Sequence, residues 1–219
     1  MKKILLGGLI LASNFSFAQI DFRSTRFGVV GGATYSRVRN AHNPSGARYS
    51  VLGGLVALVP IGSDDQFYLQ AEALYYGAGE GGDKDYEKAK GWEHAVYANN
   101  YISVPLNFKA FFSEAESEFF GLIGPRFNFL INQKVTNPSK DSYKSDSYGK
   151  ANSFNFGLGL GIGYSYKRQL ELALKYDLGL SNTYPNLKYS PEEMMTLDPS
   201  VSKSKSENVI SLGLTYFFQ

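Results

Sequence analysis

Side chains capable of acid–base or nucleophilic chemistry are few in this 219-residue chain, which has no cysteine and two histidines, His42 and His94. A serine nucleophile would need one of these histidines together with an acid such as Asp83 or Glu93. No Gly-x-Ser-x-Gly segment is present. Both histidines lie in polar stretches, where such side chains are usually solvated. The pattern therefore predicts no catalytic residue.

Metal and nucleotide sites are also poorly supported by residue spacing. One acidic stretch contains Glu80, Asp83, Asp85 and Glu87, but it lacks the residue order of a calcium-binding loop. Glycines alternate with large residues between positions 157 and 163. A dinucleotide-binding turn would instead need Gly-x-Gly-x-x-Gly between a strand and a helix. We therefore predict no metal and no cofactor.

The elements that must position any functional group are strands. Between residues 154 and 164 a large apolar side chain occupies every second position, and asparagine or glycine occupies the others. The same alternation, with polar or small residues on the second face, runs through residues 170–180 and 210–218. A period of two indicates β-strands that present different faces to different environments.

Eight such segments can be recognised, and most are ten or more residues long, which matches the roughly 9–11 residues of a tilted membrane-crossing strand. They span residues 27–36, 49–61, 67–76, 100–111, 119–131, 154–164, 170–180 and 210–218. Short connections alternate strictly with long ones (37–48, 77–99, 132–151 and 181–207). The long connections are polar, and we expect loops without helices there. Outer-membrane barrels show this alternation of short turns and long external loops.

The chain begins like a signal peptide. Lys2 and Lys3 precede an apolar stretch that ends in Ser16-Phe17-Ala18. We expect residues 1–18 to be removed and residues 19–219 to form one barrel domain. Without the two lysines, Lys+Arg falls from 22 to 20 and equals the 20 Asp+Glu. A formally neutral domain implies no nucleic-acid partner.

The principal structural alternative is a soluble eight-stranded barrel in which the apolar face lines a cavity. The strand at 154–164 argues against it, because four alternate glycines would then face water, where they add neither charge nor packing. Inside a narrow barrel, glycines leave room for longer side chains from other strands. The expected fold is therefore all-β, an eight-stranded antiparallel up-and-down transmembrane β-barrel. We expect it in the outer membrane of a Gram-negative bacterium, with periplasmic termini and extracellular long loops.

Aromatic residues make up 15% of the chain and concentrate near strand ends. Two rings of aromatic side chains are typical where a barrel crosses the membrane interfaces. We expect Phe27, Phe67, Phe111, Phe119 and Phe218 near the periplasmic side, and Tyr35, Tyr49, Tyr75, Tyr101 and Phe154 near the outer side.

Polar residues at the inward positions of the strands are the first candidate functional group. Charges in so narrow a lumen must be paired. The residues are Gln70, Glu72, Asn107, Lys109, Arg126, Asn128, Glu171, Lys175 and Asp177. We expect a network of ion pairs and hydrogen bonds, with Glu72 and Arg126 as one pair. The network either fills the barrel as a plug or lines a selective conduit.

Aromatic and methionine side chains in the long loops are the second candidate group: Tyr86, Trp92, Tyr97, Tyr184, Tyr189, Met194 and Met195. If exposed, such clusters often mark binding surfaces. The alternative is that the loops fold on one another and cap the barrel.

Several segments resemble the PorT-like outer-membrane β-barrels that are abundant in Bacteroidota. They are residues 67–76 (FYLQAEALYY), 101–109 (YISVPLNFK), Gly124-Pro125, the glycine-rich 154–164 strand and residues 176–182 (YDLGLSN). The resemblance covers the whole predicted barrel and implies the eight-stranded fold. It implies no shared activity, although some members serve protein secretion or gliding machinery.

Three functions remain open at this stage. The first is a non-enzymatic structural or docking subunit of a larger outer-membrane complex for secretion, assembly or motility. Its partners would be outer-membrane lipid and one or more proteins. The second is a small-solute pore, and the third is a lipid-acting enzyme that uses a loop histidine. The first is favoured, because so few catalytic groups are available and eight strands leave little room for a pore.

Overall fold

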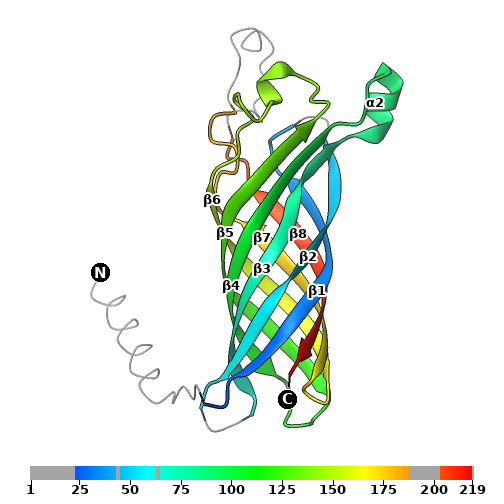
Figure 1. The fold of residues 1–219 in the computed structure, drawn as a ribbon. Helices are drawn as coiled ribbons and strands as arrows, with labels where there is room; N and C mark the ends of the chain where they lie inside the picture. The colour runs from blue at the N-terminus through cyan, green and yellow to red at the C-terminus, as the bar shows by residue number, and fades with distance from the viewer. Residues whose placement is uncertain (1–22, 43–44, 63–64, 188–202, 219) are drawn as a thin grey trace, which may run out of the picture.

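The computed structural model describes residues 23–42, 45–62, 65–187 and 203–218, and within them eight strands form one closed antiparallel barrel in chain order (Figure 1). The strands are β1 (Arg26–Val38), β2 (Ser45–Pro60), β3 (Phe67–Gly82), β4 (Val96–Phe111), β5 (Glu118–Thr136), β6 (Phe154–Tyr166), β7 (Leu170–Gly179) and β8 (Glu207–Phe217). The predicted fold class is confirmed. The expected signal peptide, residues 1–18, lies outside the described residues.

Each strand pairs with the next, and the first pairs with the last. Val29 lies opposite Leu55 on β2 and opposite Tyr216 on β8. Closure gives every strand two neighbours, so that no edge runs the length of the wall. The short connections and the two ends of the barrel domain lie at one end, called here the short-turn end (Figure 1). The opposite end is the long-loop end.

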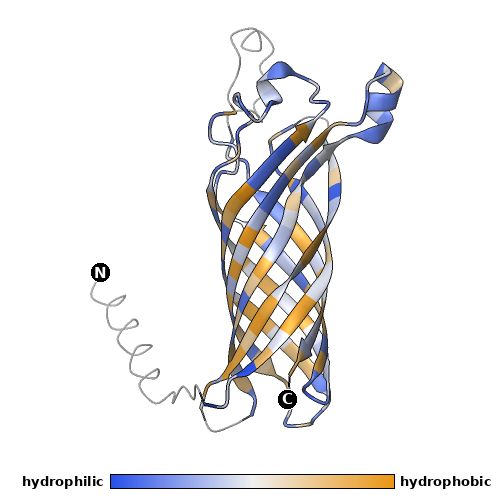
Figure 2. Cartoon of the chain, viewed as in Figure 1, coloured by the Kyte–Doolittle hydropathy of each residue, from blue (hydrophilic) through white to orange (hydrophobic). Residues whose placement is uncertain are grey.

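Apolar residues recur along the wall of the barrel, whereas its long-loop end is more hydrophilic (Figure 2). On β7, Leu172 and Leu174 are exposed whereas Ala173 between them is buried. Large exposed apolar side chains recur on all eight strands of the barrel. A bilayer covers such outward apolar side chains in membrane barrels.

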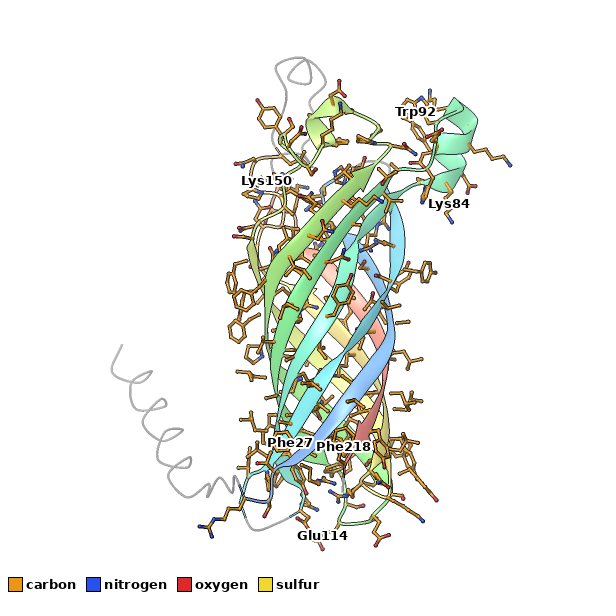
Figure 3. All side chains as sticks on the ribbon, in the orientation of Figure 1. Phe27, Lys84, Trp92, Glu114, Lys150 and Phe218 are labelled. Atoms are coloured by element: carbon orange, nitrogen blue, oxygen red, sulfur yellow. The ribbon has the colours of Figure 1, made fainter. Side chains whose placement is uncertain are left out.

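Most aromatic side chains expected at the two interfaces do point outward, among them Phe27 and Phe218 at the short-turn end (Figure 3). The expectation is wrong for Tyr101 and Phe111, which are 0% and 3% exposed. Both lie at odd-numbered positions of β4, and odd positions of this strand face the lumen, as those of Asn107 and Lys109 do. Proximity to a strand end therefore predicted their height correctly but their face wrongly.

Strands β3, β4 and β5 extend further toward the long-loop end than their apolar segments do. Residues 77–81 and 96–99, expected to be loop, continue the pairing of β3 with β4. The connection between them holds a short helix, α2 (Lys84–Lys90), which corrects the expectation of loops without helices. The Asp83 carboxylate caps its first turn by accepting from the Tyr86 amide at 2.9 Å, and Gly91 ends it in the left-handed conformation at φ 67°.

A second helical turn, η1 (Asp141–Tyr143), lies in the connection from β5 to β6, which was also expected to be loop. None of the helices in the described part of the chain is long and apolar enough to cross a membrane.

Candidate functional site: the barrel interior and the long-loop end

The nine polar residues expected inside the barrel all lie on inward positions of their strands. Eight are buried, and Lys175 is partly buried. They come from four strands: Gln70 and Glu72 from β3, Asn107 and Lys109 from β4, Arg126 and Asn128 from β5, and Glu171, Lys175 and Asp177 from β7. Alternation along each strand places them there, because successive side chains point to opposite faces.

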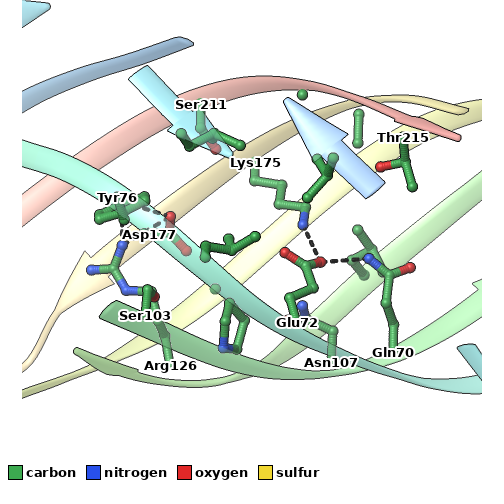
Figure 4. A pocket seen from close by; sticks show the side chains of 18 of the residues that line it. Gln70, Glu72, Tyr76, Ser103, Asn107, Arg126, Lys175, Asp177, Ser211 and Thr215 are labelled. Atoms are coloured by element: carbon green, nitrogen blue, oxygen red, sulfur yellow. Dashed lines mark hydrogen bonds and ion pairs between the residues drawn. The ribbon is translucent and has the colours of Figure 1, made fainter. Parts of the chain in front are cut away.

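Three ion pairs cross the lumen. Lys109 Nζ lies 2.5 Å from Glu171 Oε2, and Lys175 Nζ lies 2.5 Å from Glu72 Oε1. The third pair joins Arg126 Nη1 to Asp177 Oδ2 at 2.9 Å (Figure 4). Each buried charge of these pairs therefore has a partner of opposite sign.

The expected pairing of Glu72 with Arg126 is wrong. Glu72 instead accepts hydrogen bonds from Lys175 and from the Gln70 amide, the latter at 2.5 Å. Arg126 donates to the Tyr76 hydroxyl, which in turn donates to Asp177 at 3.0 Å. Parity along a strand predicts the face of a side chain, whereas partners depend on strand tilt and stagger, which parity does not contain.

The glycines of β6 make room for these long side chains. A Cβ atom added at Gly159 would lie 3.0 Å from Asp177 Oδ1, and one at Gly161 would lie 3.0 Å from Lys175 Cγ. At Gly163 it would overlap the ring of Phe120. The inward face of β6 is therefore occupied by side chains of β5 and β7, its two neighbours.

The space left inside the barrel is small. A cavity of about 30 Å³ lies at mid-height between Glu72, Lys175, Asn107 and Arg126. Such a space can hold buried water, and it is far smaller than a cavity that admits a solute. The described part of the lumen therefore has the geometry of a plug rather than that of a conduit for solutes.

Aromatic side chains fill the lumen at the short-turn end. Phe111, Phe120 and Phe217 are buried there with Tyr68. Lys109 Nζ lies 4.0 Å from the ring centre of Phe120, so the cation contacts an aromatic face as well as the Glu171 carboxylate. This layer closes the barrel below the ion pairs.

His42 organises the long-loop end, and sequence reasoning missed it by treating it as a solvated residue. It is only 6% exposed, and its Nδ1 forms a close hydrogen bond with the buried Glu80 carboxylate. Its ring stacks on Tyr97, with ring centres 3.6 Å apart, and meets Tyr143 and Tyr184 edge-on. Tyr97 lies on β4, Tyr143 between β5 and β6, and Tyr184 after β7. Three separate segments of the chain therefore pack around one imidazole. No pattern in the sequence signals this, because the contacts join distant segments.

His42, Glu80, Tyr97, Tyr143 and Tyr184 form a buried cluster at the long-loop end, called here the cap. Two of its tyrosines are residues expected on an exposed loop surface. Tyr97 and Tyr184 are 1% and 0% exposed, so the prediction of a binding surface is wrong for them. Burial raises the pKa of the Tyr184 phenol well above its ordinary value, and Asn99 donates to its oxygen at 3.0 Å. The alternative, in which loops cap the barrel, applies here. Tyr189, Met194 and Met195 lie outside the described residues.

Tyr86 and Trp92 are exposed at the long-loop end, on and just after α2 (Figure 3). Trp92 has the larger exposed fraction, 48%. They form the remaining part of the expected loop surface that the structure describes.

The acids expected for a catalytic group do not contact the histidines. His42 contacts Glu80, and His94 Nδ1 lies 2.7 Å from Glu87 Oε2. Asp83 and Glu93 are therefore not the partners of the histidines. Within the described ranges, no three His, Asp or Glu side chains form a group that could hold a metal ion.

Comparison with known proteins gives one family match. The model described as "Outer membrane protein beta-barrel domain" matches residues 16–184. A comparison with curated proteins gives no match.

Among solved structures, similar chains include three small barrels. Ail, the attachment invasion locus protein of Yersinia pestis, is 10% identical, with 88% of this chain and 98% of that chain covered and a TM-score of 0.41. OprG from Pseudomonas aeruginosa is 12% identical, with 89% and 96% covered and a TM-score of 0.43. Neisserial surface protein A is 16% identical, with 88% and 97% covered and a TM-score of 0.44.

Proposed function

Because this chain belongs to the family of outer-membrane protein β-barrel domains, we propose that it is a non-enzymatic docking subunit that binds a protein partner in the outer membrane. The short-turn end would face the periplasm and the long-loop end the cell exterior, as is usual for such barrels. As part of this proposal, the chain is a PorT-like barrel of the kind found in Bacteroidota, a group in which some members act in secretion and gliding machinery.

The open edge of β5 is the observation that carries the proposal. β4 pairs with β5 as far as Thr136, whereas β6 pairs with β5 only as far as Phe129. Residues 130–136 therefore have a sheet neighbour on one side only within the described part of the chain. An exposed strand edge is a template on which an extended segment of another protein can add as a further strand.

Part of this edge is already covered by the chain itself. The Leu130 amide donates to the Ser153 carbonyl at 2.8 Å, and the Gln133 side chain donates to the Gly149 carbonyl at 2.7 Å. Beyond Gln133, the side chains of Lys134 and Thr136 are exposed. The final residues of β5 are thus the part of the edge available to a partner.

The barrel interior supports docking over the alternative of a pore. Three ion pairs span it, and the remaining cavity is only about 30 Å³. A lipid-acting enzyme gains no support, because the buried His42 stacks in the cap and the partly exposed His94 is held by Glu87.

Site-specific photo-crosslinking in native membranes tests this function. A photoreactive residue at Lys134 should yield an adduct with one protein, and gentle detergent extraction should recover that protein in fixed stoichiometry. The matched control places the same residue at Leu172, on the outward apolar face, where lipid is the expected neighbour. A barrel that elutes alone and gives no adduct at Lys134 would contradict the proposal.

A further inference from the structure

A cleft of about 350 Å³ lies at the long-loop end, where the segment after α2 meets the segment after β5. Trp92 and Glu93 line it from the first segment, and Asn137 and Pro138 line it from the second. Its volume lies within the range of small-molecule sites, roughly 300–1,000 Å³. It does not involve the open edge of β5, and the inference drawn from it is independent of the proposed docking function.

The indole ring of Trp92 packs against one aromatic neighbour and remains half exposed. Its backbone amide donates to the Glu87 carbonyl at 2.9 Å, directly after the left-handed Gly91. The Tyr86 ring packs edge-on against the indole, with ring centres 6.0 Å apart and planes at 77°. Trp92 belongs to none of the buried apolar clusters. An exposed aromatic ring that is not part of the core is available as a platform for a ligand.

The two carboxylates of the cleft differ in their availability. Glu87 is engaged, because it accepts from His94 and, at 2.9 Å, from the Ala95 amide. Glu93 is exposed, and its carboxylate has no hydrogen-bond or ion-pair partner in the described part of the chain. Asn137, in the left-handed region at φ 47°, uses its amide NH₂ in a long contact of 3.5 Å to the His94 carbonyl. The rim of the cleft thus offers a free acceptor and an amide beside the ring.

We propose that this cleft binds a sugar residue of an uncharged or amino-sugar glycan. A pyranose ring has one face of C–H groups and an edge of hydroxyl groups. The C–H face would stack on Trp92, and the hydroxyl or ammonium groups would donate to the Glu93 carboxylate and contact the Asn137 amide. An apolar platform with a few convergent polar groups is the chemistry that such a ligand requires.

Charge and surroundings narrow the choice of ligand. A sulfate or phosphate group beside Glu93 would be repelled by its carboxylate, so the sugar that stacks on Trp92 is expected to carry no such group there. A protein side chain would need a surrounding ring of apolar contacts that excludes water, as the centres of protein interfaces have. Here Lys88, Lys90 and Glu93 are exposed around the indole, and Tyr86 is the one large exposed apolar neighbour in the described hairpin tip. A small polar ligand fits this setting better.

Trp92 is the only tryptophan in the chain, so its fluorescence reports on this cleft alone. The full barrel in nanodiscs should be titrated with chitohexaose, deacetylated chitohexaose, maltohexaose and mannohexaose, and with a sulfated heparin hexasaccharide. At least one unsulfated sugar should shift the emission to shorter wavelength and protect it from acrylamide, and the sulfated sugar should do neither. No change with any sugar at millimolar concentration would overturn the proposal, as would a response to the sulfated sugar alone.

Two variants separate ligand contact from structure. Glu93→Gln keeps the shape and should weaken binding of the responding sugar at least tenfold, whereas Glu114→Gln, at the opposite end of the barrel (Figure 3), should leave it unchanged. Trp92→Ala should abolish binding measured by calorimetry while its heat-modified gel migration stays normal, since the ring is not part of the core. Unchanged affinity in Glu93→Gln would overturn the proposal. So would a fluorescence response to hexa-arginine without one to sugars, which would identify a partner's basic side chain as the occupant.

Discussion

Arg126 on β5 forms an ion pair with Asp177 on β7 at 2.9 Å, although β6 lies between the two strands. The contact is available because Gly157 lies beside Arg126 and Gly159 lies beside Asp177, and neither glycine projects a side chain between them. The glycine face of β6 and the ion pairs of the lumen are therefore one structural feature. Side chains of β5 and β7 meet over the inward face of β6, where its glycines leave room.

Removing the cation of this pair should destabilise the barrel strongly. Arg126→Met leaves the buried Asp177 carboxylate without its counter-charge, with the Tyr76 hydroxyl as a remaining donor. Breaking one partner of a buried pair costs about 3–5 kcal/mol. The measurement is the free energy of unfolding in urea, with the folded fraction at each urea concentration read from heat-modified gel migration.

A double-mutant cycle then tests the partner assignment. Combining Arg126→Met with Asp177→Leu should recover much of the loss, since no uncompensated charge remains. Combining Arg126→Met with Glu72→Gln should recover little, because Glu72 pairs with Lys175. A larger coupling energy between Arg126 and Glu72 than between Arg126 and Asp177 would support the pairing of Arg126 with Glu72.

A side chain at an inward glycine should also be costly. At Gly163 an added Cβ would meet the ring of Phe120 and the Leu172 carbonyl oxygen, so Gly163→Val overfills the lumen near the short-turn end. Overpacking typically costs about 1–3 kcal/mol. Ile162→Val, at the next position on the outward face, is the control and should have a much smaller effect on urea unfolding. Equal effects of the two substitutions would contradict the packed lumen.

Alternation along the strands predicts the fold and the composition of the lumen well. Each strand segment carries enough outward Leu, Ile, Phe or Tyr to identify its face, and the inward polar positions follow from parity, as for Glu72 and Lys109. Alternation holds no information on the stagger between strands, which decides the side chains that lie at the same height in the lumen. It therefore cannot distinguish Asp177 from Glu72 as the partner of Arg126.

The long-loop end is where sequence reasoning is weakest. The glycine-rich residues 77–81 have a loop-like composition, yet they pair with β4 and are buried. His42 is in contact with Tyr97, Tyr143 and Tyr184, which come from three other segments of the chain. Such a cluster depends on how loops pack together, which local patterns do not contain.

Arg168 should hold the short-turn end together. It lies in the turn from β6 to β7 and donates to the Asp65 carbonyl at 2.6 Å and to the Ala115 carbonyl at 3.2 Å, and it forms a close ion pair with Glu118. One guanidinium therefore joins all three short turns. Arg168→Ala should speed protease cleavage within residues 112–117 severalfold in folded protein, measured by mass spectrometry.

The adjacent Lys167 supplies the control for this prediction. Lys167→Ala changes charge in the same turn without removing those three contacts, so its cleavage rate should match that of the unchanged protein. Equal rates for the two variants would show that Arg168 does not tie the turns.

The cap at the long-loop end should loosen when His42 is removed. His42→Ala takes away the hydrogen bond to Glu80 and the ring against which Tyr97 stacks, and it leaves a cavity among Tyr143 and Tyr184. Amide hydrogen exchange of residues 140–151 and 183–187 should rise by at least tenfold. His94→Ala, which alters a partly exposed side chain, should leave exchange in these segments unchanged; a similar rise there would rule out a specific role for His42.

The closed lumen is the claim on which the docking function most depends, and single-channel conductance in planar bilayers tests it most directly. The purified barrel should give no current steps above the bare bilayer, because paired charges and aromatic layers leave a cavity of about 30 Å³. The double variant Phe120→Ala/Lys109→Ala, which removes side chains from the closing layer, is the comparison for sensitivity. Clear, reproducible steps from the unchanged protein would contradict the plug and revive the pore.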